Sequence, residues 1–258
     1  MQAKKGKVYI IGAGPGDPEL ITVKGLKALK KADVIVYDFL AGPELLKSAR
    51  RSAEKICVGK SDGLHLLEQG AINRLLYEKT KEIHRAGVAT PARCKIVVRL
   101  KGGDPLVFSR GIEEALYLKK KGIDFEIIQG LTSAFAAPES FGIPLTRKGK
   151  YSSVAVLTGR KSNGEALDAP ACDTLVYLMA VANIENVIKA IIGSGREKTT
   201  PCAFIEKGTM GKERVIMGNL SNIAKKAGEY NVQSPAVFIV GEVVKYGKII
   251  YGNTYKKR

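Results

Sequence analysis

The sequence has no tryptophan and only two histidines among its 258 residues. The two, His65 and His84, are too few for a conventional zinc site, so we expect no metal centre. The cysteines are widely spaced and form no CxxC pair, which is typical of reduced thiols rather than of a disulfide framework. They are Cys57, Cys94, Cys172 and Cys202.

Long apolar runs are also absent. No stretch approaches the roughly 18 consecutive apolar residues of a membrane-spanning helix. The first residues are basic and then apolar, but Gly12, Pro15 and Asp17 interrupt the apolar run too early for a signal peptide. We therefore expect a cytoplasmic protein without a membrane partner, in which residues 7–14 form a first strand.

Acidic residues are outnumbered by basic ones, and the formal net charge is +17. Such a charge predicts a polyanionic partner, solubility through repulsion, or a lysine-rich composition without a special role. A nucleic-acid-binding protein is one alternative. Against it, aromatic residues make up only 7% of the chain, and no stacking or zinc motif is present.

Strands and helices alternate through the first part of the chain, which is typical of a mainly parallel α/β sheet. Strands are predicted at 7–14, 33–37, 55–58, 96–100 and 124–128, and helices at 22–31, 43–48, 68–85, 111–122 and 133–141. Residues 142–153 break the pattern with glycine, proline and charge. Beyond them, strands are predicted at 154–158, 174–178, 203–205, 215–217 and 236–240, and helices at 184–193 and 220–227. We predict two α/β domains, 1–147 and 148–258, the second with a mixed sheet.

The most informative stretch is KIVVRLKGGDPLVFSRG, residues 95–111. A β-branched apolar run predicts a buried strand, which stops where Gly102, Gly103, Asp104 and Pro105 follow. Open α/β sheets bind ligands beyond the carboxyl ends of their strands, and paired glycines let a ligand approach the backbone. The alternative is a strand-to-helix turn that uses glycine and aspartate for geometry alone.

The first strand enters a similar loop, GAGPGD, residues 12–17. Gly12 and Gly14 match a dinucleotide-binding fingerprint, and Asp38 ends the next strand at a suitable distance. Asp17, however, occupies the third glycine position, where its charge would oppose a pyrophosphate. A nicotinamide-dependent oxidoreductase is therefore a weak alternative.

Several loops taken together resemble one family. GAGPGDPELITVKG, DVIVYD, VGK, VVRLKGGDP, GLTSAFAAP, GIPLT, LMAVAN and EKGT occur in this order with compatible spacing over nearly the whole chain. They resemble the uroporphyrinogen-III C-methyltransferase family of the tetrapyrrole methylase superfamily. The GAGPGD and GGDP loops are shared across the superfamily, whereas VRLKGGDP with GIPLT and VGK points to the narrower family.

The resemblance implies a tetrapyrrole methylase-like architecture, with S-adenosylmethionine bound in a cleft between the two domains and S-adenosylhomocysteine as product. The cofactor-binding residues that it implies are Pro15, Gly102, Gly103, Asp104, Val107, Thr132, Ser133, Met179 and Gly208. Glycines suit close backbone approach, hydroxyl groups suit the polar parts of the cofactor, and Val107 and Met179 suit its adenine. For Thr132 and Ser133, helix capping is the alternative, and for Met179 it is core packing.

The resemblance assigns Asp38 as proton acceptor and Lys60 as proton donor. Both follow predicted strands, so both are expected at the same edge of the sheet. From spacing alone, Asp38 also fits a cap at the end of a strand, and Lys60 fits a solvated lysine. Arg110 and Arg147 are hypothetical clamps for substrate carboxylates, because guanidinium groups bind carboxylates through two hydrogen bonds.

This sequence departs from the usual family pattern at four positions, Gln129, Ser109, Arg147 and Ala180, where proline, glycine, histidine and glycine are common. These departures concern substrate detail more than cofactor binding. The implied activity is methylation of uroporphyrinogen III at two pyrrole carbons, through precorrin-1 to precorrin-2, for sirohaem or cobalamin biosynthesis. The family also implies a homodimer. A methyltransferase acting on a later precorrin or another tetrapyrrole is the nearest alternative.

Overall fold

A computed structural model describes residues 6–59, 67–84, 93–161 and 167–251. The chain divides into two compact units, residues 1–132 and 133–258. Each unit is built on one five-stranded sheet. No helix among the described residues is long and apolar enough to cross a membrane.

The sheet of the first unit is entirely parallel, as the alternating pattern predicted. Its strands stand in the order β3 (Glu54–Cys57), β2 (Val34–Tyr37), β6 (Ile96–Lys101), β1 (Lys7–Gly12) and β7 (Asp124–Ile128). The inner strands β1, β2 and β6 are almost wholly buried. Apolar, β-branched strands of this kind are expected where both faces of a parallel sheet are covered.

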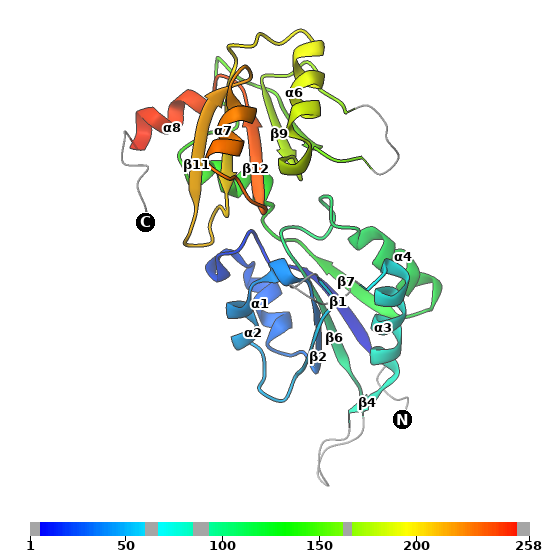
Figure 1. The fold of residues 1–258 in the computed structure, drawn as a ribbon. Coiled ribbons are helices and arrows are strands. Elements are labelled where there is room, and N and C mark those ends of the chain that lie inside the picture. The colour runs from blue at the N-terminus through cyan, green and yellow to red at the C-terminus, as the bar shows by residue number, and fades with distance from the viewer. Residues whose placement is uncertain (1–5, 60–66, 85–92, 162–166, 252–258) are drawn as a thin grey trace. The chain divides into compact units, whose positions relative to one another are not determined.

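Helices cover both faces of this sheet (Figure 1). The helices α1 (Val23–Leu29) and α2 (Pro43–Lys47) pack on one face, and α3 (Gln69–Lys81) and α4 (Gly111–Lys120) pack on the other. Thr22 caps α1, its hydroxyl accepting a hydrogen bond from the Gly25 amide at 3.1 Å. Two 3₁₀ turns, η1 (Pro18–Leu20) and η2 (Phe39–Ala41), follow β1 and β2.

The sheet of the second unit is mixed, as predicted. The strands stand in the order β11 (Arg214–Asn219), β10 (Pro201–Glu206), β12 (Ala236–Val240), β9 (Thr174–Leu178) and β8 (Val154–Thr158). Only β8 and β9 pair in parallel, and the other neighbours are antiparallel. The helices are α5 (Ser133–Glu139), α6 (Ile184–Gly193), α7 (Ile223–Glu229) and α8 (Val244–Tyr251), with a 3₁₀ turn η3 (Val181–Asn183).

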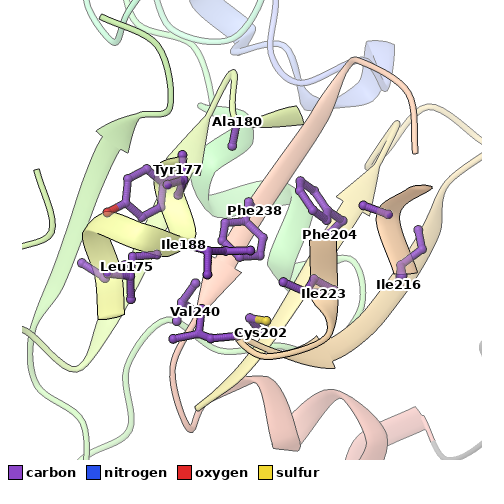
Figure 2. Packing of buried hydrophobic residues seen from close by; sticks show 14 of the residues in the cluster. Leu175, Tyr177, Ala180, Ile188, Cys202, Phe204, Ile216, Ile223, Phe238 and Val240 are labelled. Atoms are coloured by element: carbon purple, nitrogen blue, oxygen red, sulfur yellow. The ribbon is translucent and has the colours of Figure 1, made fainter. Parts of the chain in front are cut away.

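Aromatic side chains form the centre of the second unit's core (Figure 2). The Phe204 and Phe238 rings lie 4.7 Å apart between centroids, and Tyr177 lies 6.4 Å from Phe238. Residues of α6 and α7 complete this cluster, while α5 and α8 pack on the opposite face of the sheet. Both faces of the mixed sheet are therefore buried by helices.

Three differences between the structure and the sequence prediction concern whole elements or the division of the chain. The boundary predicted at 147/148 lies later than the division at 132/133, because Ala134, Ala137 and Phe141 pack into the core of the second unit. The helix predicted over 68–85 ends at Lys81, because β4 (Ile83–His84) pairs with β5 (Arg93–Cys94). The third difference is α8, which the sequence reading missed.

Candidate active site

The loops singled out from the sequence leave neighbouring strands of the first unit at their carboxyl ends. The GAGPGD loop follows β1, Asp38 follows β2, the GGDP loop follows β6, and Gln129-Gly130 follows β7. Because all five strands are parallel, these ends share one edge of the sheet. Open α/β sheets bind ligands at this edge.

Three of these loops meet through glycine backbone. A Cβ on Gly130 would lie 2.2 Å from the Gly103 carbonyl oxygen and 2.6 Å from the Gly12 Cα. A Cβ on Gly12 would lie 2.5 Å from the Gly130 Cα. Any larger residue at either position would push the loops apart, so the sequence needs glycine here for close approach.

Asp104 ties the loops together with its side chain. Its Oδ1 accepts a hydrogen bond from the Leu106 amide at 2.8 Å, and its Oδ2 accepts one from the Gly130 amide at 3.1 Å. The geometric alternative therefore accounts for both oxygens of this carboxylate. Gly103 has φ +66°, and a Cβ there would meet no described atom within 4 Å, while its amide and carbonyl groups both hydrogen-bond to Gly14. Asp104 therefore shapes the loop, and Gly103 is partly buried within it.

The Asp38 side chain contacts a group of buried charged residues. The Arg99 Nη2 donates to the Asp38 Oδ1 at 2.5 Å, and the Lys101 Nζ lies 3.8 Å from the Asp38 Oδ2. Both cations also bond to the Glu114 Oε1 at 3.0 Å, from the Arg99 Nε and the Lys101 Nζ. Asp38 precedes η2, but its side chain makes no capping hydrogen bond. The alternative that it is a cap is therefore wrong.

Strand β6 and helix α4 together place these charged side chains next to Asp38. Arg99 and Lys101 alternate along β6 with Val98 and Leu100, which belong to the apolar cluster of the opposite face. They therefore share the face that α3 and α4 cover, and Glu114 of α4 meets them there. Burial lowers the pKa of Lys101 below its ordinary value of 10.5, and the nearby Arg99 charge acts in the same direction.

The sequence reading missed Arg99, Lys101 and Glu114 as site residues. One signal was available, because two cations spaced two residues apart inside an apolar strand must share one buried face. Their acidic partner could not be found in the same way. Glu113 and Glu114 both begin α4, and only the structure shows that Glu114 is buried while Glu113 pairs with Arg110.

Several further loops contain residues other than glycine with positive φ. Among the described residues, those other than glycine with positive φ are Phe108, Arg110, Met179, Lys207, Thr209 and Asn231. Apart from Asn231, all lie in or beside the GGDP, LMA and EKGT loops. Positive φ is unfavourable for such side chains and concentrates at functional sites. Met179 is 50% exposed, so the alternative of core packing is wrong.

Gly208 lies between two of these strained residues and is buried. A Cβ on Gly208 would lie 2.6 Å from the Ala137 Cβ of α5. This contact within the second unit gives a packing reason for the glycine, beside the cofactor role that remains a prediction. Ser133 is the first residue of α5, and Pro15, Val107 and Thr132 are half-buried in loops of the first unit.

The two candidate clamps already have partners. The Arg110 guanidinium donates to both carboxylate oxygens of Glu113, at 2.8 and 2.7 Å. Arg147 donates to the Tyr246 hydroxyl and stacks 5.0 Å from the centroid of its ring. Arg110 belongs to the first unit and Arg147 to the second. Lys60 lies outside the described residues, so its proposed role stays a prediction.

Sequence and structure comparisons place this arrangement among known proteins. The family model described as Tetrapyrrole (Corrin/Porphyrin) Methylases matches residues 7–224. The chain belongs to this family. It is 49% identical over 245 residues to the uroporphyrinogen-III C-methyltransferase of Methanocaldococcus jannaschii, covering 93% of this chain and 97% of that protein. The resemblance found in the sequence is confirmed.

Solved structures of tetrapyrrole methylases share the fold. Uroporphyrin-III C-methyltransferase from Thermus thermophilus, solved with S-adenyl homocysteine, has a TM-score of 0.75 and 38% identity, covering 93% of this chain and 99% of that one. A cobalamin-biosynthetic cobalt precorrin-4 methyltransferase has a TM-score of 0.76 and 28% identity, covering 92% and 95%. The predicted fold class, with a parallel and a mixed sheet, is confirmed.

Proposed function

We propose that this tetrapyrrole methylase transfers methyl groups from S-adenosylmethionine to two pyrrole carbons of uroporphyrinogen III, through precorrin-1 to precorrin-2. The observation that carries the proposal is the 49% identity, over nearly the full length of both chains, to a uroporphyrinogen-III C-methyltransferase. The position of Asp38 at the ligand-binding edge of the parallel sheet fits this activity.

The residues present fit S-adenosylmethionine. Gly103 leaves free the space that a side chain would fill, and the loops around Met179 and Gly208 hold strained residues of the kind found at binding sites. We assign cofactor contacts to Pro15, Gly102, Gly103, Asp104, Val107, Thr132, Ser133, Met179 and Gly208. When bound, this cofactor supplies a methyl group on a positively charged sulfur.

The protein's part in the reaction is to orient the substrate, exclude water and move protons. Methylation of a fully substituted pyrrole carbon leaves the ring positively charged, so a proton must then leave the ring nitrogen or a neighbouring bridging carbon. Asp38 is 29% exposed and accepts that proton on its carboxylate in our proposal. We assign the complementary proton donation to Lys60.

The charge of the chain fits the substrate. Uroporphyrinogen III is a polycarboxylate, and the chain carries a formal net charge of +17. Arg110 and Arg147 would exchange their present partners, Glu113 and Tyr246, for substrate carboxylates. We further propose a cytoplasmic homodimer that uses no metal and binds no nucleic acid.

One alternative substrate has specific support. The similarity to a cobalt precorrin-4 methyltransferase favours a later precorrin as the second candidate. The two candidates share the cofactor loops and differ in the tetrapyrrole. Competition between uroporphyrinogen III and a later precorrin distinguishes them, because the true substrate will suppress methylation of the other.

The test is an anaerobic reaction of the purified chain with uroporphyrinogen III and S-adenosylmethionine, with products analysed by mass spectrometry. We expect the addition of two methyl groups. Cofactor binding without methyl transfer would favour the later-precorrin alternative. Failure to bind the cofactor, measured by calorimetry, would contradict both.

A further inference from the structure

We propose that Arg99, held by Glu114 and assisted by Lys101, is a positioning residue that orients the Asp38 carboxylate for proton transfer. This inference rests on the proposed function and extends it to three buried residues. None of them is assigned a role by the family motifs used above. They act through Asp38, because each is almost wholly buried while Asp38 is partly exposed.

The hydrogen bonds of the buried Arg99 guanidinium fix the orientation of the Asp38 carboxylate. Arg99 bonds with one nitrogen to Asp38 and with another to Glu114, and its third nitrogen donates to the carbonyl oxygens of Val36 and Leu100 at 3.4 and 3.3 Å. A planar guanidinium bound in this way cannot rotate without losing several bonds. The Asp38 oxygen that it holds is therefore fixed relative to β2 and β6.

The charges balance across the group. Asp38 and Glu114 carry negative charge, Arg99 and Lys101 carry positive charge, and neutral Gln69 of α3 donates to the Glu114 Oε1 at 3.2 Å. Glu114 is fully buried, and its Oε2 has no hydrogen-bond partner among the described residues. Four groups thus form one coupled unit, with Asp38 as its only partly exposed member.

Stability alone does not account for this arrangement. Buried ion pairs can often be replaced by apolar residues of similar size without loss of stability, because removing charges from water is costly. The group lies on the face of β6 whose other buried neighbours are apolar, such as Val97, Ala115 and Leu118. Its charges converge on the partly exposed carboxylate beside the ligand loops. This placement points to control of that carboxylate.

The test is a double-mutant cycle on methyl transfer at saturating substrates. Arg99→Lys keeps a positive charge but loses the planar fork, and we expect kcat to fall about 100-fold, the order of loss caused by small misplacements of reacting groups. Cofactor affinity, measured by calorimetry, should change little. In an Asp38→Asn background, adding Arg99→Lys should change kcat by less than about 3-fold, because the residue acts through Asp38.

A second variant replaces Arg99→Lys in the test if that protein does not fold, and a control variant measures general destabilisation. Glu114→Gln is expected to show the same non-additivity with Asp38→Asn, so it carries the test if Arg99→Lys does not fold. Lys79→Met is the matched control, since Lys79 is another largely buried cation of the first unit and bonds to Glu54 and Glu82 instead. It should leave kcat unchanged.

The outcomes separate the two proposals. An active wild type in which the Arg99→Lys and Asp38→Asn losses multiply would overturn the positioning role alone. An equal loss of kcat in Lys79→Met would also overturn it, because the effect would then be general destabilisation. A wild type that transfers no methyl group would overturn the proposed function, and this inference with it.

Discussion

The two units bury different kinds of side chain. Among the described residues, the buried charges of the first unit are Asp33, Arg99, Lys101 and Glu114, whereas the second unit buries Glu206 alone. The second unit instead buries aromatic rings, Tyr177, Phe204 and Phe238, and no aromatic ring is buried in the described part of the first. The difference fits our proposal that proton transfer takes place at the parallel sheet, beside its buried charges.

The largest expected effect is at the glycine contact of the first unit. In Gly130→Ala the added Cβ would meet the backbone of two other loops, so we expect a loss of more than about 4 kcal/mol in the free energy of unfolding. Urea denaturation measures this. Gly70→Ala in α3 is the control, since a Cβ there meets no described atom within 4 Å. A stable Gly130→Ala would mean that the loops do not meet as described.

A substitution in the core of the second unit should lower the stability of the protein without changing its rate of methyl transfer. Phe238→Ala removes a ring that packs on Phe204 and Tyr177, and we expect a loss of about 3 to 4 kcal/mol in the free energy of unfolding. Methyl transfer per folded molecule should change little, as measured by kcat below the unfolding transition. A large fall in kcat with intact folding would contradict the division of roles between the units.

Lys101 should make stability depend on pH. Because burial lowers its pKa from 10.5, the unfolded chain binds more protons than the folded chain between the lowered value and 10.5. The free energy of unfolding should rise with pH through that window, by at most about 1.4 kcal/mol per pH unit, and Lys101→Met should remove the rise. Parallel stability curves for wild type and variant would contradict this.

Lys79→Met removes a lysine whose pKa is shifted in the opposite direction from that of Lys101. Hydrogen bonding to Glu54 raises the pKa of Lys79, so its contribution to stability is complete below 10.5 and is lost only as the pH rises through the raised value. Urea denaturation at a series of pH values between neutral pH and 10.5 should therefore show a pH-dependent difference from wild type for Lys101→Met alone.

The smallest expected effect is at Met179. Its φ of +57° is unfavourable for a side chain, so Met179→Gly should raise the free energy of unfolding by about 1 kcal/mol. If the strain serves cofactor binding, the same variant should bind S-adenosylmethionine more weakly in calorimetry. Higher stability with unchanged affinity would show that the strained residue has no role in binding.

Local patterns predicted most of the fold. The β-branched runs predicted β2, β6 and β12 with few errors at their ends, and the helix predicted at 22–31 corresponds to α1, which Thr22 caps. The division of the chain was less predictable. Residues 133–147 follow a strand of the first unit, and only tertiary packing assigns α5 to the second sheet.

The site was predictable only in part. The sequence located Asp38 and the GGDP loop from strand ends and from family resemblance. It did not show the partners of Asp38, because Arg99 lies 61 residues away along the chain and Glu114 a further 15. Nor did it show that Asp104 binds the Gly130 amide, 26 residues away. Such long-range partners depend on sheet order rather than on local pattern.

The most direct test of the account is the methyl-transfer rate of Asp38→Asn at saturating cofactor and uroporphyrinogen III. The variant keeps the size of the side chain and removes its ability to accept a proton. We predict a fall in kcat of about 100-fold or more, with cofactor affinity unchanged, as expected for loss of a general base. A variant with the wild-type rate would contradict the assignment of proton chemistry to the edge of the parallel sheet.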